Sequence, residues 1–142
     1  MKYLSSYNNL IDIFLIFNIH AAFSQEEFNE VKAKIEIEKV EDVLSVTGMV
    51  ENLKSEFKNI SFELAVQKKN TSNTNSAINK QSGRFTLEPL NKISLSSTKI
   101  NINKDEQIII SLFIYNEKDI LIGKDRVVVE SEKKKMILKS GV

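Results

Sequence analysis

Length, composition and charge exclude several classes of function. The chain of 142 residues contains 20 basic and 19 acidic side chains, and its net charge of +1 gives no overall attraction to nucleic acid or to an anionic membrane. It contains no cysteine and no tryptophan, and its one histidine, His20, lies in a segment that we expect to be removed. Disulfides are therefore excluded, and zinc or copper sites, thiol nucleophiles and Ser-His-Asp relays lack an essential residue. We expect no enzyme, no catalytic residue, no metal and no cofactor; carboxylate-only or Ser-Lys catalysis stays formally open, but no residue spacing supports it.

The first 24 residues have the pattern of a signal peptide. Lys2 supplies a positive start, residues 10–19 form a short apolar run, and Ala22 and Ser24 place small side chains three and one positions before Gln25. The apolar run is too short for a transmembrane helix. We expect cleavage after Ser24, export to the periplasm or to the cell exterior, and no membrane contact afterwards. An N-terminal amphipathic helix or a misplaced start codon is the alternative.

Three segments in the first half of the mature chain alternate apolar and polar residues, which is the pattern of half-buried β-strands. They cover residues 31–39, 43–50 and 59–68. In the first segment, Val, Ala and Ile alternate with Lys and Glu without exception. Gly48 in the second segment predicts a bulge or a close backbone approach.

Residues 69–82 are nearly all Asn, Ser, Thr and Lys. They hold too little apolar surface to offset the entropy of ordering them, so we predict a long mobile loop. Such a loop is either functional or, as the simpler interpretation, a solvated insertion. A short strand over residues 83–89 ends at Pro89, which favours an edge position or a strand end over the middle of a sheet. Another strand follows over residues 93–102.

The densest apolar stretch, residues 107–130, predicts a β-hairpin at the middle of a sheet. β-Branched and aromatic residues fill both faces of residues 108–115, and residues 116–119 form a polar turn. An uninterrupted return strand would bury Lys124 and Arg126, and unpaired buried cations are strongly unfavourable.

We therefore predict a bulge or bend at Gly123-Lys124 within this return strand. Seven strands joined by polar connections predict an all-β fold, a seven-stranded antiparallel immunoglobulin-like β-sandwich over residues 25–130. An open barrel with a similar strand count is the alternative. The lysine-rich residues 131–142 predict a frayed C-terminal tail.

Two clusters of polar residues have weak site patterns. Glu36 and Glu38 share one strand face and could form a carboxylate pair, but an ordinary solvated face is the better interpretation. Asn101, Asn103 and Asp105 have the alternate spacing of a calcium loop. The glycine and the closing glutamate of such a loop are missing, so a simple turn is the better interpretation.

The central strand is apolar on both faces, which leaves one face for a partner. If the even-numbered residues from Ile108 to Ile114 face the core, the odd-numbered residues face outward. An exposed apolar patch of this kind often marks a partner surface. The expected patch contains Ile109, Phe113 and Tyr115, joined by Ala65 and Leu121, and it is bordered by Lys68, Lys124 and Arg126. Coverage by the tail, by the N-terminal lead-in or by the polar loop is the alternative.

Three stretches resemble a known family. They are AKIEIEKVEDVLSVTG at residues 33–48, QSGRFTLEPLNKISLSSTKINI at residues 81–102 and IYNEKDILIGKDRVVVE at residues 114–130. With the signal-peptide pattern and the missing catalytic residues, they make the chain similar to the curli-assembly chaperones of the CsgH/CsgC type, in particular to a Bacteroidota-like branch. The CsgC branch carries a Cys-x-Cys motif, so the absence of cysteine agrees with the CsgH branch.

The resemblance implies a small exported chaperone that keeps curli-type amyloid subunits from polymerising before secretion, through transient electrostatic and strand-edge contacts. It implies a monomer with a transient amyloid client and no nucleic-acid or membrane partner. The client-binding candidates, taken from the predicted patch and its neighbouring cations, are Lys68, Arg84, Ile109, Phe113, Tyr115, Lys124 and Arg126. The alternative from another class is a non-catalytic immunoglobulin-like adhesion or structural module of a cell-envelope complex.

Overall fold

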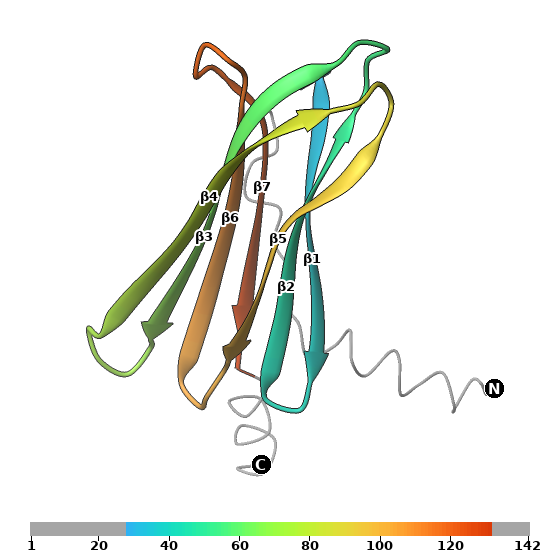
Figure 1. The fold of residues 1–142 in the computed structure, drawn as a ribbon. Helices are drawn as coiled ribbons and strands as arrows, with labels where there is room; N and C mark the ends of the chain where they lie inside the picture. The colour runs from blue at the N-terminus through green and yellow to red at the C-terminus, as the bar shows by residue number, and fades with distance from the viewer. Residues whose placement is uncertain (1–27, 132–142) are drawn as a thin grey trace, which may run out of the picture.

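Two antiparallel β-sheets pack face to face in the computed structural model, which describes residues 28–131 (Figure 1). One sheet has three strands in the order β1-β2-β5, and the other has four in the order β4-β3-β6-β7. The strands are β1 (Val31–Val40), β2 (Val43–Asn52), β3 (Lys58–Asn70), β4 (Ser76–Leu87), β5 (Lys92–Asn101), β6 (Glu106–Tyr115) and β7 (Leu121–Glu130). The seven-stranded immunoglobulin-like sandwich is confirmed, and the barrel alternative is not.

Residues 28–131 contain no helix, and therefore none that is long and apolar enough to cross a membrane. The predicted signal peptide, residues 1–24, lies outside the described residues. So do residues 132–142 of the predicted tail. Ser131, its first residue, is buried, and its amide donates a hydrogen bond to the Glu106 carbonyl at 3.2 Å, so this residue packs onto the sandwich.

The core lies between the two sheets, where alternate residues of each strand meet. β6 contributes most, because Ile108, Ile110, Leu112 and Ile114 are all fully buried. Leu112 pairs across the sheet with Leu64 of β3, so neighbouring strands present the same alternation to the same side. The predicted hairpin is therefore only half central: β6 lies inside the four-stranded sheet, whereas β7 forms its edge.

The segment at residues 69–82 is not a loop, contrary to the prediction. β3 continues to Asn70, β4 begins at Ser76, and only residues 71–75 connect them. Twelve consecutive pairs join β3 to β4, from Lys58 with Leu87 to Lys69 with Ser76. A polar segment forms a strand here because β4 is an edge strand whose faces meet solvent, so its backbone pairing needs no apolar burial. Pro89 was predicted to mark an edge position or a strand end; β4 is an edge strand and ends at Leu87, two residues before Pro89.

Glycines mark both irregular positions that the sequence predicted. The pairing of β2 with β5 shifts between Gly48 and Met49, and a methyl group on Gly48 would lie 3.4 Å from Leu112. The pairing of β6 with β7 shifts at Ile122, one residue before the predicted Gly123-Lys124. Ile122 and Gly123 both face inward as a result, which turns the two following cations out of the core.

Candidate functional site

The solvent-facing surface of the four-stranded sheet, called the outer face below, gathers most of the predicted client-binding residues. Directly paired residues on neighbouring strands project to the same side of a sheet, so the register defines this face. Phe113 of β6 pairs with Glu63 of β3 and with Lys124 of β7. The rows of paired residues on the outer face, read from β4 to β7, are Arg84–Ser61–Tyr115–Leu121, Ser82–Glu63–Phe113–Lys124, Lys80–Ala65–Ser111–Arg126 and Ile78–Gln67–Ile109–Val128.

Six of the seven candidate residues therefore share one surface, and Lys68 does not. Lys68 pairs with Ile108, which faces the core, so its side chain starts from the inner face. Its ammonium lies 3.7 Å from a carboxylate oxygen of Glu106. The sequence already contained the signal, because Lys68 is in phase with the buried Leu64 and Val66. The expectation that Lys68 borders the patch is corrected.

The outer face also contains residues that the sequence did not indicate. Lys80 and Ile78 belong to it because their segment is a strand, and Ile78 is 59% exposed. Val128 ends the row of Ile109, and although it faces outward it is buried. The position of these three residues on the outer face could not be predicted. The sequence of residues 76–82 indicates a loop, and the register of β7 depends on the bulge at Ile122.

Cations predominate on the outer face. β4 carries Lys80 and Arg84 and no acidic residue, and β7 carries Lys124 and Arg126 on the same side. The carboxylate of Glu63 lies between these pairs, 3.6 Å from the Lys80 ammonium. The ammonium of Lys124 lies 6.0 Å from the centre of the Phe28 ring, a cation–π arrangement that ties the lead-in of β1 to β7.

Tyr115 is the titratable side chain with a perturbed pKa on this face. Burial of its phenol raises the pKa, and the nearby Glu63 carboxylate raises it further. Both effects disfavour the phenolate. Tyr115 therefore stays neutral at physiological pH, as a half-buried apolar ring with a hydroxyl that can donate a hydrogen bond.

A hollow of about 540 Å³ lies at the end of the outer face, beside the turn between β6 and β7. Asn59 organises it: its side-chain amide donates to Glu117 at 2.6 Å, and its carbonyl oxygen accepts from the Thr86 hydroxyl at 2.8 Å. Arg84 and Asp119 also line it. The hollow offers hydrogen-bonding groups of both charges, and it continues the surface that carries the cations of β4.

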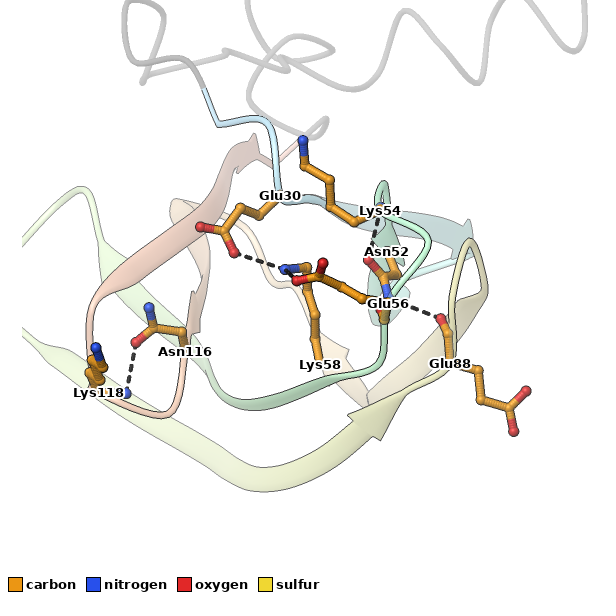
Figure 2. A network of polar contacts seen from close by, with 8 residues as sticks. All are labelled: Glu30, Asn52, Lys54, Glu56, Lys58, Glu88, Asn116 and Lys118. Carbon is orange, nitrogen blue, oxygen red and sulfur yellow. Dashed lines mark hydrogen bonds and ion pairs between the residues drawn. The ribbon is translucent and has the colours of Figure 1, made fainter.

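A polar network fixes the connections at this end of the sandwich (Figure 2). Asn52 is 1% exposed, and its amide donates to the carbonyls of Glu56 and Glu88 at 2.7 and 3.0 Å. The ammonium of Lys58 lies 3.0 Å from Glu30 and 3.5 Å from Glu56. Its hydrogen bond with Glu30 raises the pKa of Lys58, although burial acts in the opposite direction. This network is structural, because the Asn52 side chain and the Lys58 ammonium at its centre bond to other groups of the chain.

The weak site patterns do not assemble into a metal site. Among residues 28–131 there is no group of three or more His, Cys, Asp or Glu side chains that could hold a metal ion. Asn103 and Asp105 lie in the turn before β6. The backbone amide of Asn103 donates to the Glu106 carboxylate at 2.8 Å, and Asp105 adopts a positive φ of 63°. Glu36 and Glu38 are exposed on the outer side of the three-stranded sheet.

Solved structures with the same fold include two curli proteins. The E. coli curli protein CsgC matches with a TM-score of 0.56 at 12% identity, over 68% of this chain and 96% of that chain. CsgH of R. palustris matches with a TM-score of 0.50 at 14% identity, over 73% of this chain and 94% of that chain. A Bacteroides uniformis β-glucuronidase matches with a TM-score of 0.51 at 11% identity, over 73% of this chain but only 15% of its own.

At these identities the likeness concerns the fold alone. No model of a known protein family matches the sequence, and no curated protein matches it. The two curli proteins are matched over nearly their whole length, whereas the glucuronidase is matched over one part of a much longer chain. The chain thus has the immunoglobulin-like sandwich fold found in the curli proteins CsgC and CsgH.

Proposed function

We propose that this protein is an exported chaperone that delays amyloid polymerisation of curli-type subunits by binding them transiently at β4 and along the outer face. The observation that carries the proposal is β4 itself. It is long and exposed along most of its length, it pairs on one side only, with β3, and its charged residues are both basic. The fold shared with CsgC and CsgH supports the same function.

A strand edge suits an amyloid-forming client. An extended segment that is about to join a fibril exposes a row of backbone donors and acceptors. The free edge of β4 offers the complementary row, and five of its twelve residues are Ser, Asn, Gln or Thr. A client strand can therefore pair with β4 in place of the fibril end. Because the contact consists of backbone pairing and polar side chains, we expect it to be short-lived.

The cations of the outer face act on the rate at which the client encounters the protein. Lys80 and Arg84 flank the free edge, and Lys124 and Arg126 extend the positive surface across to β7. Such a surface accelerates encounter with an acidic client, and salt screens the attraction. The half-buried rings of Phe113 and Tyr115 then provide apolar contact between the two cationic borders.

A fibrillation assay with a curlin-type subunit tests the proposal. At a concentration well below that of the client, the protein should lengthen the lag time, and rising ionic strength should shorten the lag again. Replacing Lys80 and Arg84 by Glu should abolish most of the delay. The matched control replaces Lys32 and Lys34, which are exposed on the outer side of the other sheet, and should keep it. A delay that changes neither with ionic strength nor on replacement of the β4 cations contradicts the proposal.

Export belongs to the same proposal and has its own test. Protein recovered from the periplasm or the culture medium of an expressing bacterium should begin at Gln25 when its N-terminus is sequenced. A chain that retains residues 1–24 would support the alternative N-terminal helix.

A non-catalytic adhesion or structural module is the second candidate. One observation favours it: the same fold forms a minor part of a long glucuronidase chain, so it also serves as a building block within larger proteins. The exposed side chains of Phe57, Leu90 and Ile120 in the connections at one end could then contact a neighbouring envelope component. Stable capture of one envelope protein, without any effect on fibril growth, would identify this function.

A further inference from the structure

The free edge of β4 is unusually regular for an edge strand. Its twelve pairs with β3 show no register shift, so no bulge twists it away from a partner, and no proline interrupts it. Natural edge strands are usually short, bulged, proline-bearing or covered. In Figure 1 the half of β4 that begins at Ser76 splays away from the three-stranded sheet, and residues 76–80 are all exposed. Lys80 and Arg84 are the protective charges that this edge possesses.

We propose that a second copy of this chain covers the edge, with the two β4 strands antiparallel about a twofold axis at Gln81. The result is a continuous eight-stranded sheet formed by two four-stranded sheets. An axis normal to the sheet keeps the outer faces of both copies on one side. Each residue then lies opposite the residue that is equally far beyond the axis on the second copy.

The charges of β4 select this register. An axis at Lys80 would place that cation opposite its own copy, and an axis at Ser82 would place Lys80 opposite Arg84; like charges in direct opposition are destabilising. An axis at Gln81 places Lys80 opposite Ser82 of the second copy. It also pairs the strand almost from end to end, whereas axes at Asn79 or Gly83 leave one end of β4 unpaired.

The same register covers the exposed apolar side chains of the strand. Ile78, 59% exposed, comes to lie opposite the aliphatic stem of Arg84 of the second copy. Phe85, 37% exposed, comes to lie opposite Ala77 of the second copy, on the inner face. Gln81 meets its own copy: its side-chain oxygen already accepts a hydrogen bond from Ser96 within one copy, and its side-chain NH2 group can donate to the second copy. Every directly opposed pair thus contains at most one charged residue.

Salt affects this dimer and the proposed client complex in opposite directions. Lys80 and Arg84 of one copy remain diagonal neighbours of the same cations on the other copy, at roughly 7–8 Å. Screening this residual repulsion strengthens the dimer, whereas screening weakens the attraction of an acidic client. If the proposed function holds, the dimer also occupies the edge that the client needs, so the dimer is a resting form from which monomers are released on dilution.

Cysteine cross-linking tests the register directly, because the chain contains no cysteine of its own. Lys80→Cys and Ser82→Cys proteins, mixed and oxidised, should form a disulfide-linked dimer, since directly opposed residues lie at about 4.5–5.5 Å between Cα atoms. Each variant alone should cross-link much less, because its cysteines are diagonal. Both positions are exposed, so neither substitution disturbs the core. Equal cross-linking of the mixture and of the single variants overturns the register.

Sedimentation equilibrium of the uncross-linked protein tests the dimer itself. The wild type should dimerise more tightly at high than at low ionic strength. Ser82→Asp, which faces Lys80 twice in the symmetric interface, should tighten the dimer roughly fivefold, and Ser82→Lys should weaken it by a similar factor. A thermal melt of each variant controls for the contact of Ser82 with Glu63 inside one copy.

The outcomes separate the dimer from the chaperone proposal. A protein that stays monomeric at every concentration and salt, with Ser82→Asp and Ser82→Lys alike, overturns the dimer even if it delays fibril growth. A salt-strengthened dimer whose Ser82 variants shift as stated supports it even if the protein has no effect on fibrils.

Discussion

The two long sides of the sandwich differ in the contacts that join the two sheets. On the β1/β7 side, the backbone amide of Ile35 donates a hydrogen bond to the Asp125 carboxylate at 2.8 Å, and Val31 packs on Gly123. On the β4/β5 side, the bond that crosses between the sheets is a side-chain contact between Ser96 and Gln81. The first side uses a backbone amide, a part-buried carboxylate and core groups, and the second uses two part-buried polar side chains.

This difference follows from the unequal number of strands in the two sheets. A three-stranded sheet cannot cover a four-stranded one, so one strand must project beyond it. The strand that projects is β4, whose composition tolerates water on both faces. The uncovered edge is therefore set by the fold, and it is the edge to which we assign both client and dimer contacts. The predictions below measure the contrast between the two sides.

The largest expected contrast comes from two isoleucines. Ile35 on β1 is 6% exposed, whereas Ile78 on β4 is 59% exposed. Replacing Ile35 by Ala removes buried methyl groups and leaves a cavity, so we expect a loss of about 2–5 kcal/mol in the free energy of unfolding. Replacing Ile78 by Ala should change it by less than about 0.5 kcal/mol. Urea denaturation followed by circular dichroism measures both, and equal losses would show that β4 is buried in solution.

The two hydrogen bonds that cross between the sheets give the next contrast. Asp125→Ala leaves the part-buried amide of Ile35 without its acceptor, for which we expect a loss of about 1–3 kcal/mol. Gln81→Ala removes the bond to Ser96 near the solvent-exposed edge, where water can replace it, and should cost less than about 1 kcal/mol. The same urea denaturation experiment measures both losses. Asp125→Asn, which keeps one acceptor oxygen, serves as the control.

Two glycines allow a comparison of packing on the two sides. A methyl group on Gly123 would lie 2.9 Å from Val31, a stiff β-branched side chain in the core. A methyl group on Gly83 would lie 3.0 Å from the Phe62 ring, beneath an edge strand that can yield. We expect Gly123→Ala to cost about 1–3 kcal/mol, from overpacking, and Gly83→Ala to cost clearly less. Thermal melts of the two variants measure both losses, and a larger loss of stability for Gly83→Ala than for Gly123→Ala would contradict this expectation.

The smallest effect concerns the ion pairs at the end of the sandwich. Lys58 joins β3 to Glu30 before β1, and its pKa is raised above the ordinary value of 10.5. A group whose folded-state pKa is raised stabilises the fold fully below its unfolded-state pKa and loses that contribution as the pH rises through the folded-state pKa. Stability should therefore fall above about pH 10.5, with Lys58→Gln removing part of the fall.

Tyr115 acts in the same direction, because its pKa is also raised. Phenolate absorbance separates the two residues: a Tyr115→Phe variant should lose one late-titrating phenol and keep the contribution of Lys58. If stability rises rather than falls through this alkaline range, the stated directions of both pKa shifts are contradicted.

Sequence periodicity predicted the strands that have one buried face. β1, β2, β3 and β6 follow the expected alternation within a few residues, because burial of one face requires an apolar residue at every second position. The position of the bulge in β7 was also predictable to within one residue, since two cations could not be buried there without partners. Most of the outer face followed from the same parity argument.

The sequence by itself thus determined the all-β class, the core face of most strands and, through the lack of cysteine, the absence of disulfides and thiol sites. Only the tertiary structure decided that residues 76–82 form a strand and that β4 rather than β7 has the open edge. These features depend on pairing with distant segments: a strand that buries neither face carries no apolar period, and an edge is free or covered according to what the other sheet reaches.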